Sequence, residues 1–375
     1  MRIFLAIVAF TLVGVDCGAA RPEAYWGGFA FKGSMANAGK RYPVFHRLLT
    51  NDADNGAKYG GDIQAYFRDW FHSKSGDMTG VVLKVGLADI EKTSLSLSFA
   101  ITEETVMVER LGSNFKVNIQ LGFEAVLLDF EKLQVVSSTP ILIEFRDATD
   151  KEPDDQYLSE KIALMTFGEN SQLSKALESK IIQIKPLAAA QLSTLRVLST
   201  SISDVAKEYL PAYMLGGLEA ELNSAQIVLG QTFSYMLNDR AGIALLPFIK
   251  DSANARMALV FIDGSVVNFT VPRPSFAIDL DLKGFKKVRV KETRAESLWI
   301  YGAFLNIRVY DPDLNTDYMN TTYKHGIQKV IPATQTRVDE FPVFNEALKG
   351  AILKAISGMQ ADERTRKVVI ENCKI

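Results

Sequence analysis

Two stretches, Ser98-Phe99-Ala100-Ile101 and Ser275-Phe276-Ala277-Ile278, carry the same four residues at the start of strand-like segments. Each is followed by a polar hairpin and an aliphatic strand, which ends in Leu127-Leu128-Asp129 in the first case and in Val309-Tyr310-Asp311 in the second. The recurrence of the same elements in the same order predicts an internal repeat.

Strand patterns continue through both blocks. In Val117-Asn118-Ile119-Gln120-Leu121, apolar and polar residues alternate with the period of a half-buried strand. Ser137-Ser138-Thr139 and Asn320-Thr321-Thr322 mark a further strand in each block, and an amphipathic helix follows later. We therefore predict an α+β fold made of two similar, mainly antiparallel sheet-plus-helix units joined by a largely helical segment. An antiparallel α+β fold without a repeat is the alternative.

Changes in composition divide the chain into five parts. Residues 1–20 form an apolar leader, 21–185 a first α+β domain, 186–240 a helical connecting segment, 241–360 a second α+β domain, and 361–375 a charged tail. The helical prediction for the connecting segment rests on apolar residues at helical spacing up to Tyr209. The end of the tail is expected to be mobile.

The leader has the form of a signal peptide. Arg2 precedes an apolar run from Ile3 to Val15, which is shorter than the roughly 20 residues that span a bilayer. Gly18-Ala19-Ala20 supplies the small residues of a cleavage site before Arg21. We expect an exported protein, periplasmic or secreted; a buried first helix is the alternative. No later run is long or apolar enough to predict a transmembrane span.

The cysteines set two further expectations. Lipidation of Cys17 would anchor the protein, but Asp16 stands where bacterial lipoproteins carry a small residue. After cleavage only Cys373 remains, which excludes an internal disulfide. We expect Cys373 to be an exposed thiol in the tail, with a bridge between two chains as the alternative.

The charge balance gives the protein no global field. Lys and Arg number 42 against 44 Asp and Glu, and nothing in this balance favours a nucleic acid as partner. His46, His72 and His325 are the only histidines, and none is spaced for metal binding. We therefore assign no catalytic residue and expect no cofactor other than the calcium considered next.

One turn has the composition of a calcium loop. Oxygen-bearing side chains at alternate positions can surround a hard cation. They are Asp311, Asp313, Asn315 and Asp317. Thr316 stands where such loops need glycine, and Thr322 where a bidentate glutamate would complete the ligands. A polar hairpin turn is the favoured interpretation.

A basic stripe crosses the second block. Lys287, Arg289 and Lys291 alternate with Val288 and Val290, which places the three cations on one strand face. An anionic glycan could bind there by charge. The alternative is an edge strand that uses cationic side chains to prevent edge-to-edge pairing.

Two classes of function remain. The first is an exported non-enzymatic protein of the cell envelope that binds or assembles with other envelope components, whether protein or glycan. The strand ending in Asp129 and its return strand resemble the hairpin of curli-exporter and penicillin-binding-protein-activator types of envelope accessory protein, and this resemblance implies an assembly role. The second class is an exported hydrolase whose catalytic residues are dispersed in the sequence.

The leader gives the first testable prediction. Protein purified from its own host should begin near Arg21, because the signal peptidase removes the apolar segment. Intact mass and N-terminal sequencing measure this directly. A chain that still begins at Met1 and fractionates with the cytosol would contradict export.

Overall fold

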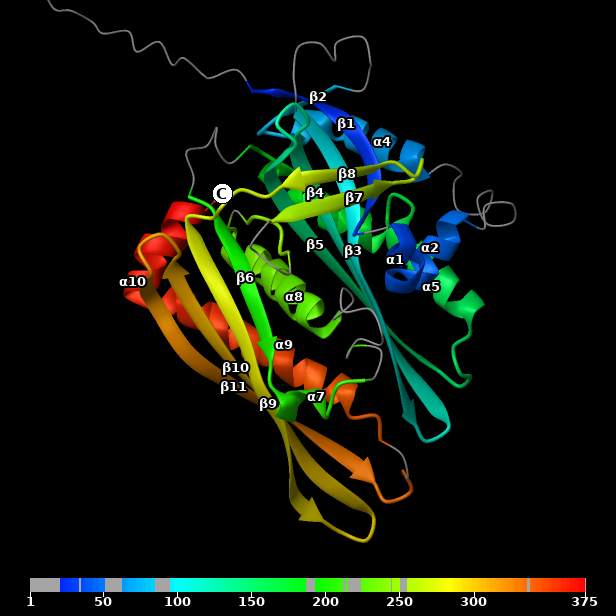
Figure 1. Cartoon of the computed structure of the whole chain (residues 1–375). Helices are drawn as coiled ribbons and strands as arrows, with labels where there is room; N and C mark the ends of the chain where they lie inside the picture. Colours follow the sequence, from blue (N-terminus) through cyan, green and yellow to red (C-terminus); the bar gives the residue numbers. More distant parts are fainter. Residues whose placement is uncertain are drawn as a thin grey trace, which may run out of the picture.

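Figure 1 shows the computed structural model of the chain, in which two sheets are packed with helices. The structure describes residues 21–33, 35–50, 63–84, 95–186, 193–211, 214, 224–243, 245–249, 255–335 and 338–374. The leader and Cys17 lie outside these residues. None of the helices within them is long and apolar enough to cross a membrane.

The first sheet has seven strands in the order β2-β1-β3-β4-β5-β8-β7. Their bounds are β1 Glu23–Lys32, β2 Val82–Lys84, β3 Leu95–Leu111, β4 Asn114–Asp129, β5 Gln134–Thr149, β7 Arg256–Phe261 and β8 Val266–Thr270. β3, β4 and β5 form an antiparallel meander, and β1 runs parallel to β3. β1 also pairs with β7, so the last strand of this order lies beside the second.

The second sheet has four strands in the order β11-β10-β9-β6. Their bounds are β6 Leu195–Ile202, β9 Phe276–Glu292, β10 Glu296–Asp311 and β11 Thr316–Pro332. β9, β10 and β11 again form an antiparallel meander, with β6 parallel to β9.

Helices follow the strands of each unit. The first unit contains α1 Met35–Arg41, α2 Pro43–Thr50, α4 Ile63–Ser73, α5 Asp155–Thr166 and α6 Gln172–Lys180. The second contains α7 Asp204–Lys207, α8 Ser224–Ala241, α9 Phe341–Ala361 and α10 Glu363–Thr365. Short 3₁₀ or π turns lie at Ser75–Asp77, Ile181–Gln183, Arg366–Ile370 and Glu371–Cys373. The predicted α+β class with two sheet-plus-helix units is confirmed.

The two units share their β-bulges as well as their strand order. Pairing skips one residue at an equivalent point in three strands of each unit, and β9 also skips Val290, which has no counterpart in β3. Each bulge residue of the first unit has a counterpart in the second: Gly27 corresponds to Leu198, Thr102 to Lys283, and Val136 to Tyr318. β3 and β9 each have 17 residues, and the bulge is the eighth residue of both. Since bulges are specific local features, their coincidence supports a true repeat.

This equivalence corrects the sequence match that first indicated the repeat. When β3 and β9 are aligned on their bulges, Ser98–Ile101 corresponds to residues 279–282. The identical stretch at Ser275–Ile278 is therefore four residues out of register with it. The match of Leu127-Leu128-Asp129 with Val309-Tyr310-Asp311 is in register, since both end strands of 16 residues. The four-residue identity is therefore a coincidence, and the hairpin that follows carries the repeat.

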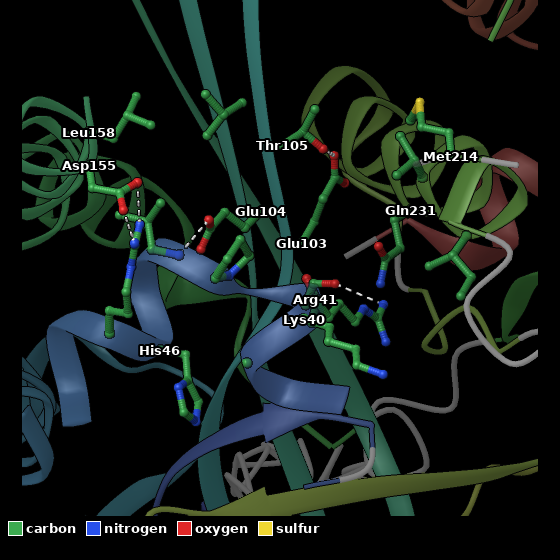
Figure 2. A pocket seen from close by; sticks show the side chains of 18 residues that line it. Lys40, Arg41, His46, Glu103, Glu104, Thr105, Asp155, Leu158, Met214 and Gln231 are labelled. Atoms are coloured by element: carbon green, nitrogen blue, oxygen red, sulfur yellow. Dashed lines mark hydrogen bonds and ion pairs between the residues drawn. The ribbon is translucent and has the colours of Figure 1, made fainter. Parts of the chain in front are cut away.

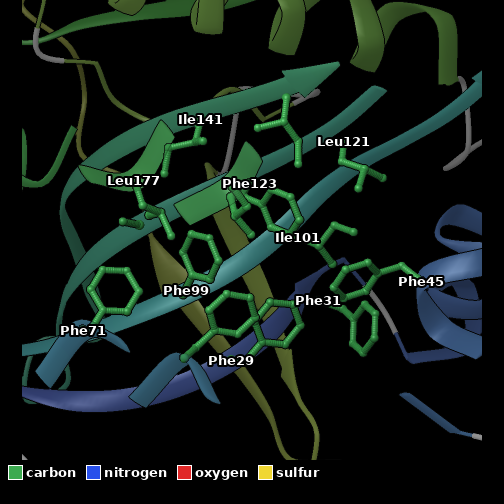
Figure 3. Close-up of a cluster of buried hydrophobic side chains, with 14 of the residues drawn as sticks. Phe29, Phe31, Phe45, Phe71, Phe99, Ile101, Leu121, Phe123, Ile141 and Leu177 are labelled. Atoms are coloured by element: carbon green, nitrogen blue, oxygen red, sulfur yellow. The ribbon is translucent and has the colours of Figure 1, made fainter. Parts of the chain in front are cut away.

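The two sheets differ in how they are covered. On one face of the first sheet, helices enclose a phenylalanine-rich core in which the Phe29 and Phe67 rings lie 5.2 Å apart (Figure 3). On its other face, Val126 and Leu128 pack against residues from β7 and β8. β4 is therefore buried on both sides from Ile119 onward, whereas burial alternates along β10. The second sheet has a core on one face only, beneath α8 and α9.

Two predictions for the second half were wrong in detail. Residues 195–202 form strand β6 rather than part of a helix, because Leu195 and Val197 enter the core while their backbone pairs with β9. The charged tail was expected to be mobile at its end, but it is packed against the domain as far as the structure describes it, to Lys374. Its apolar residues Val369, Ile370 and Cys373 are buried in the same core as α9.

The burial of Cys373 corrects the expectation of an exposed thiol. Its side chain is fully buried, and this desolvation raises the pKa of the thiol to about 12. A disulfide between two native chains would require the tail to leave the core.

We predict that Cys373 does not react in the native protein, because the reactive thiolate is not formed and the sulfur is covered. In a Cys17→Ser chain, 5,5′-dithiobis(2-nitrobenzoate) should titrate no thiol at mildly alkaline pH and one thiol in denaturant. Rapid native labelling would contradict the packed tail.

Candidate functional site

A cavity of about 650 Å³ lies where α1, α2, β3 and α5 of the first unit meet α8 of the second (Figure 2). It forms because β1 pairs with β3 only as far as Ile101, after which the chain turns into α1. β3 continues to Leu111, and no described strand pairs with this edge of it. Residues 102–106 line the cavity along this free edge.

The bulge at Thr102 lies where the free edge of β3 begins. Arg41 donates from Nη2 to the Thr102 carbonyl at 3.0 Å and from Nη1 to the Lys32 carbonyl at 3.2 Å. The corresponding bulge carbonyl of the second unit, that of Lys283, accepts a hydrogen bond from Ser203 Oγ at 2.6 Å. In both units, a side chain that follows the first strand therefore satisfies the carbonyl at the bulge.

Tyr235 brings α8 against the same bulge. Its hydroxyl is hydrogen-bonded to the Thr102 hydroxyl, and both groups are buried. The contact depends on Gly122 of β4, because a Cβ there would lie 2.4 Å from the tyrosine oxygen. A larger residue at this position would push α8 away from the cavity wall.

Glu104 points from β3 to the start of α2. Its carboxylate accepts hydrogen bonds from the backbone N–H groups of Val44 and Phe45, both at 2.9 Å. Burial raises the pKa of Glu104 to about 7, although these two bonds favour the ionised form. Glu104 is therefore committed to holding the helix N-terminus in place.

Glu103 lies on the other face of β3 and is less completely satisfied. Its Oε1 accepts hydrogen bonds from Gln120 at 2.6 Å and Thr105 at 3.2 Å, but Oε2 has no partner among the described residues. Burial raises the pKa of Glu103 to about 7, against the opposing effects of Lys349 and Arg41. Only 3% of this residue is exposed, so the unmet acceptor is costly.

Gln231 supplies a second unmet acceptor from α8. It is 2% exposed, and its Oε1 has no partner in the part of the chain that the structure describes. The rest of the wall combines charged residues, among them Lys40, Arg41 and Arg47, with the apolar residues Val106, Leu158, Met214, Ile227 and Val228. A cavity that combines apolar surface with a few polar groups is the usual form of a small-molecule site.

Sequence reasoning singled out none of these acidic and amide groups. One signal was available: Glu103 and Glu104 stand side by side in the middle of a strand, which breaks the alternation of a half-buried strand. Gln231 gave no comparable signal. His46, expected to be a packing or surface residue, lines the cavity, with its ring centroid 5.7 Å from that of Phe31.

The predicted calcium turn joins β10 to β11. Asp311 accepts backbone N–H bonds from Asp313 and Leu314, and Asp313 pairs with Arg273 at 2.7 Å. Asn315 and Asp317 both accept hydrogen bonds from Arg308. Among the described residues, no three acidic, histidine or cysteine side chains are grouped for a metal. Calcium binding stays a prediction, and the ion would have to displace two arginines.

The basic stripe is split by a bulge. Arg289 pairs with Trp299 across the sheet, but Lys291 pairs with its neighbour Leu298, so Lys291 faces the opposite side. Lys287 is ion-paired with Glu340 and stacks 4.1 Å from the centre of the Trp299 ring. The prediction of three cations on one face was wrong. The edge-strand alternative agrees with the pairing. Because β6 pairs with β9 only as far as Leu282, no described strand covers that edge of β9 where the basic residues lie.

Comparison with known proteins gives partial structural similarity only. The hypothetical protein CT253 from Chlamydia trachomatis is 10% identical over 44% of this chain and 96% of its own, with a TM-score of 0.26. A putative neuraminyllactose-binding hemagglutinin homolog from Helicobacter pylori is 14% identical over 48% of this chain and 88% of its own, with a TM-score of 0.29. A minor lipoprotein from Acinetobacter baumannii is 8% identical over 47% of this chain and 93% of its own, with a TM-score of 0.23.

These TM-scores assign neither a family nor a function to the chain. No protein-family model matches it, and no curated protein matches its sequence.

The raised pKa of Glu103 predicts a pH-dependent cost to stability. Between the ordinary value of 4.5 and the folded value of about 7, the native protein retains a proton that the unfolded chain releases. Glu103 therefore destabilises the fold as the pH rises through this window. Glu103→Gln removes the cost, so its unfolding free energy should exceed that of the wild type by roughly 1–3 kcal/mol at about pH 8.

At about pH 4 the two proteins should be nearly equal, because the carboxyl is then largely neutral in both the folded and the unfolded wild type. Urea unfolding at both pH values measures the difference. Equal destabilisation of Glu103→Gln at both would show that the carboxyl has a packing role without a titration cost.

Proposed function

We propose that this protein is an exported, non-enzymatic binding protein of the cell envelope, which holds a small amphipathic ligand in the cavity at the free edge of β3. One observation supports the binding role above the others: Glu103 and Gln231, which both line the cavity of about 650 Å³, each carry a buried side-chain oxygen without a partner among the described residues. Buried polar atoms are satisfied in the great majority of cases, so two unmet acceptors on residues of one cavity favour a binding site there.

The place in the cell rests on the sequence. The apolar leader from Ile3 to Val15 and the small residues before Arg21 support export. A role in binding an envelope component would then place the ligand, or the molecule that carries it, in that compartment.

Binding of an anionic glycan through the basic stripe is a weaker proposal. Lys287 and Arg289 already face Glu340 and Glu292, and Lys291 lies on the other side of the strand. Exposed ion pairs of this kind leave little net charge for a polyanion.

A hydrolase is the second candidate, because Glu103 combines a cavity with a pKa of about 7, which suits a general base. The hydroxyl of Thr105 donates to it at 3.2 Å and is the nucleophile that this alternative would use. Hydrolysis of p-nitrophenyl acetate by the wild type that is lost in both Glu103→Gln and Thr105→Val would favour the enzyme.

Filling the cavity tests the proposed function. Ile227 lies one helical turn before Gln231 on α8, and both line the cavity, so Ile227→Trp should occupy the ligand's space. In native mass spectrometry of protein purified from its own envelope, the wild type should carry a small-molecule adduct that Ile227→Trp lacks.

Leu164→Trp is the matched control, since Leu164 of α5 is 66% exposed and does not line the cavity. It should retain the adduct. A wild type without adduct, or an adduct that survives in Ile227→Trp, would contradict binding at this site.

A further inference from the structure

We infer that the outer face of the second sheet, the side of β9, β10 and β11 that is turned away from α8 and α9, docks on an anionic phospholipid membrane. Aliphatic side chains on this face would enter the lipid interface, and lysines beside them would meet the phosphate groups. The surface is separate from the cavity, and the inference goes beyond the binding function proposed there.

Strand pairing determines which side chains share the outer face. Tyr301 of β10 is buried in the core beneath α9, so Leu298 and Ile300, at odd distances from it along the strand, point outward. Val288 of β9 lies opposite Ile300, and Val330 of β11 lies opposite Leu298. Directly opposite residues of antiparallel strands lie on the same face. Four aliphatic side chains from three strands therefore form one patch.

The patch is open to solvent. Val288 is 43% exposed and Val330 is 50% exposed, and Leu298 and Ile300 are partly exposed. Figure 1 shows that this end of β9, β10 and β11 projects beyond α9. Single exposed apolar residues are common on protein surfaces, whereas a contiguous group of them marks an interaction surface.

Three lysines accompany the patch on the same face. Lys286 and Lys291 of β9 and Lys324 of β11 lie opposite outward-facing residues of β10. All three are exposed, and none is ion-paired with a described residue. The outward-facing residues from Leu298 to Phe304 and their partners on β9 and β11 include no acidic side chain. The face is therefore locally cationic, although the chain as a whole is nearly neutral.

This combination fits an anionic bilayer. Apolar side chains enter the boundary between head groups and acyl chains, while long lysine side chains reach the phosphates. An anionic glycan could use the lysines, but four aliphatic side chains offer it no hydrogen-bonding group. Lys287 and Arg289 lie on the other face of β9, where Glu340 and Glu292 already pair with them. The unpaired charge and the aliphatic patch thus coincide on the outer face.

Two glycines leave part of this face without side chains. Gly302 of β10 is paired with Gly326 of β11. A Cβ on Gly302 would lie no closer than 3.7 Å to the atoms around it, so packing within the protein does not require glycine there. Glycine inside a strand weakens it and often marks a place where another surface approaches the backbone. A flat area beside the patch suits a broad partner such as a bilayer.

Vesicle sedimentation tests the requirement for charge. The protein is purified from its own host, and intact mass establishes that all variants have the same N-terminus. We expect it to bind vesicles of phosphatidylcholine with about one third phosphatidylglycerol at least about tenfold more tightly than vesicles of phosphatidylcholine alone. Lys286→Gln/Lys291→Gln/Lys324→Gln should lose this preference.

The matched control for charge is Lys151→Gln/Lys175→Gln/Lys367→Gln. It removes three exposed lysines from other parts of the molecule and should retain the preference. Circular dichroism and the unfolding midpoint establish that each variant is folded.

A second variant tests the aliphatic patch. Val288→Ser/Val330→Ser should weaken binding to the anionic vesicles at least about tenfold, because two apolar side chains no longer enter the lipid interface. Leu164→Ser/Ile262→Ser is its control, since these residues are 66% and 40% exposed and lie outside the outer face. It should leave the affinity unchanged.

Several results would overturn the proposal. They are equal binding of the wild type to both kinds of vesicle, binding to neither, a preference retained by the lysine variant, and an affinity unchanged in the valine variant. If the wild type binds heparin through the three lysines but binds no vesicle, the partner is an anionic glycan. If it is a dimer in sedimentation equilibrium that Val288→Ser/Val330→Ser dissociates, a second copy covers the face. None of these results affects ligand binding in the cavity, which involves other residues.

Discussion

The hydrogen bond from Arg41 to the Thr102 carbonyl joins the end of α1 to the bulge of β3, where the free edge of this strand and the cavity begin. At this point β1 has ended, β3 has slipped by one residue, and the chain has turned into α1. A carbonyl left unpaired by the bulge would be costly in a buried position, and the guanidinium satisfies it. The same bulge turns Thr102 toward Tyr235 of α8. The start of the free edge of β3 is thereby bonded to α1 on one side and to α8 on the other.

The acidic residues beside the cavity belong to the sheet that is more completely covered. Both faces of the first sheet are buried, so desolvation raises the pKa values of Glu103 and Glu104 and lowers that of Lys32, which pairs with Glu124 at 3.0 Å. At the equivalent positions of β9 the second unit has Gly284 and Phe285, and the phenylalanine packs on Phe344. The repeat preserved the bulge, whereas the acidic pair is found in the first unit alone.

The sequence predicted the regular features of this fold and missed those that depend on contacts between distant segments. The predicted strand at Val117–Leu121 lies within β4, and a predicted amphipathic helix, α9, follows the strands of the second unit, because local periodicity determines which face is buried. β6 was predicted as helix, because the eight residues from Leu195 to Ile202 are too few to distinguish the 3.6-residue period of a helix from the two-residue period of a strand. The repeat was inferred from a match four residues out of register, because bulges leave no mark in a single sequence.

The cavity could not be derived from the sequence for a related reason. Its acceptors come from β3 and α8, more than a hundred residues apart, and the wall exists only because β1 stops at Lys32. Glu103 and Glu104 gave a visible signal, but spacing alone could not tell which of the two would be satisfied by a helix N-terminus and which would be left with a free oxygen.

A crystal structure of the protein purified from its own envelope, with no ligand added, tests the central claim most directly. The account predicts electron density for a non-protein molecule in the cavity at the free edge of β3. A cavity that contains only water would contradict it.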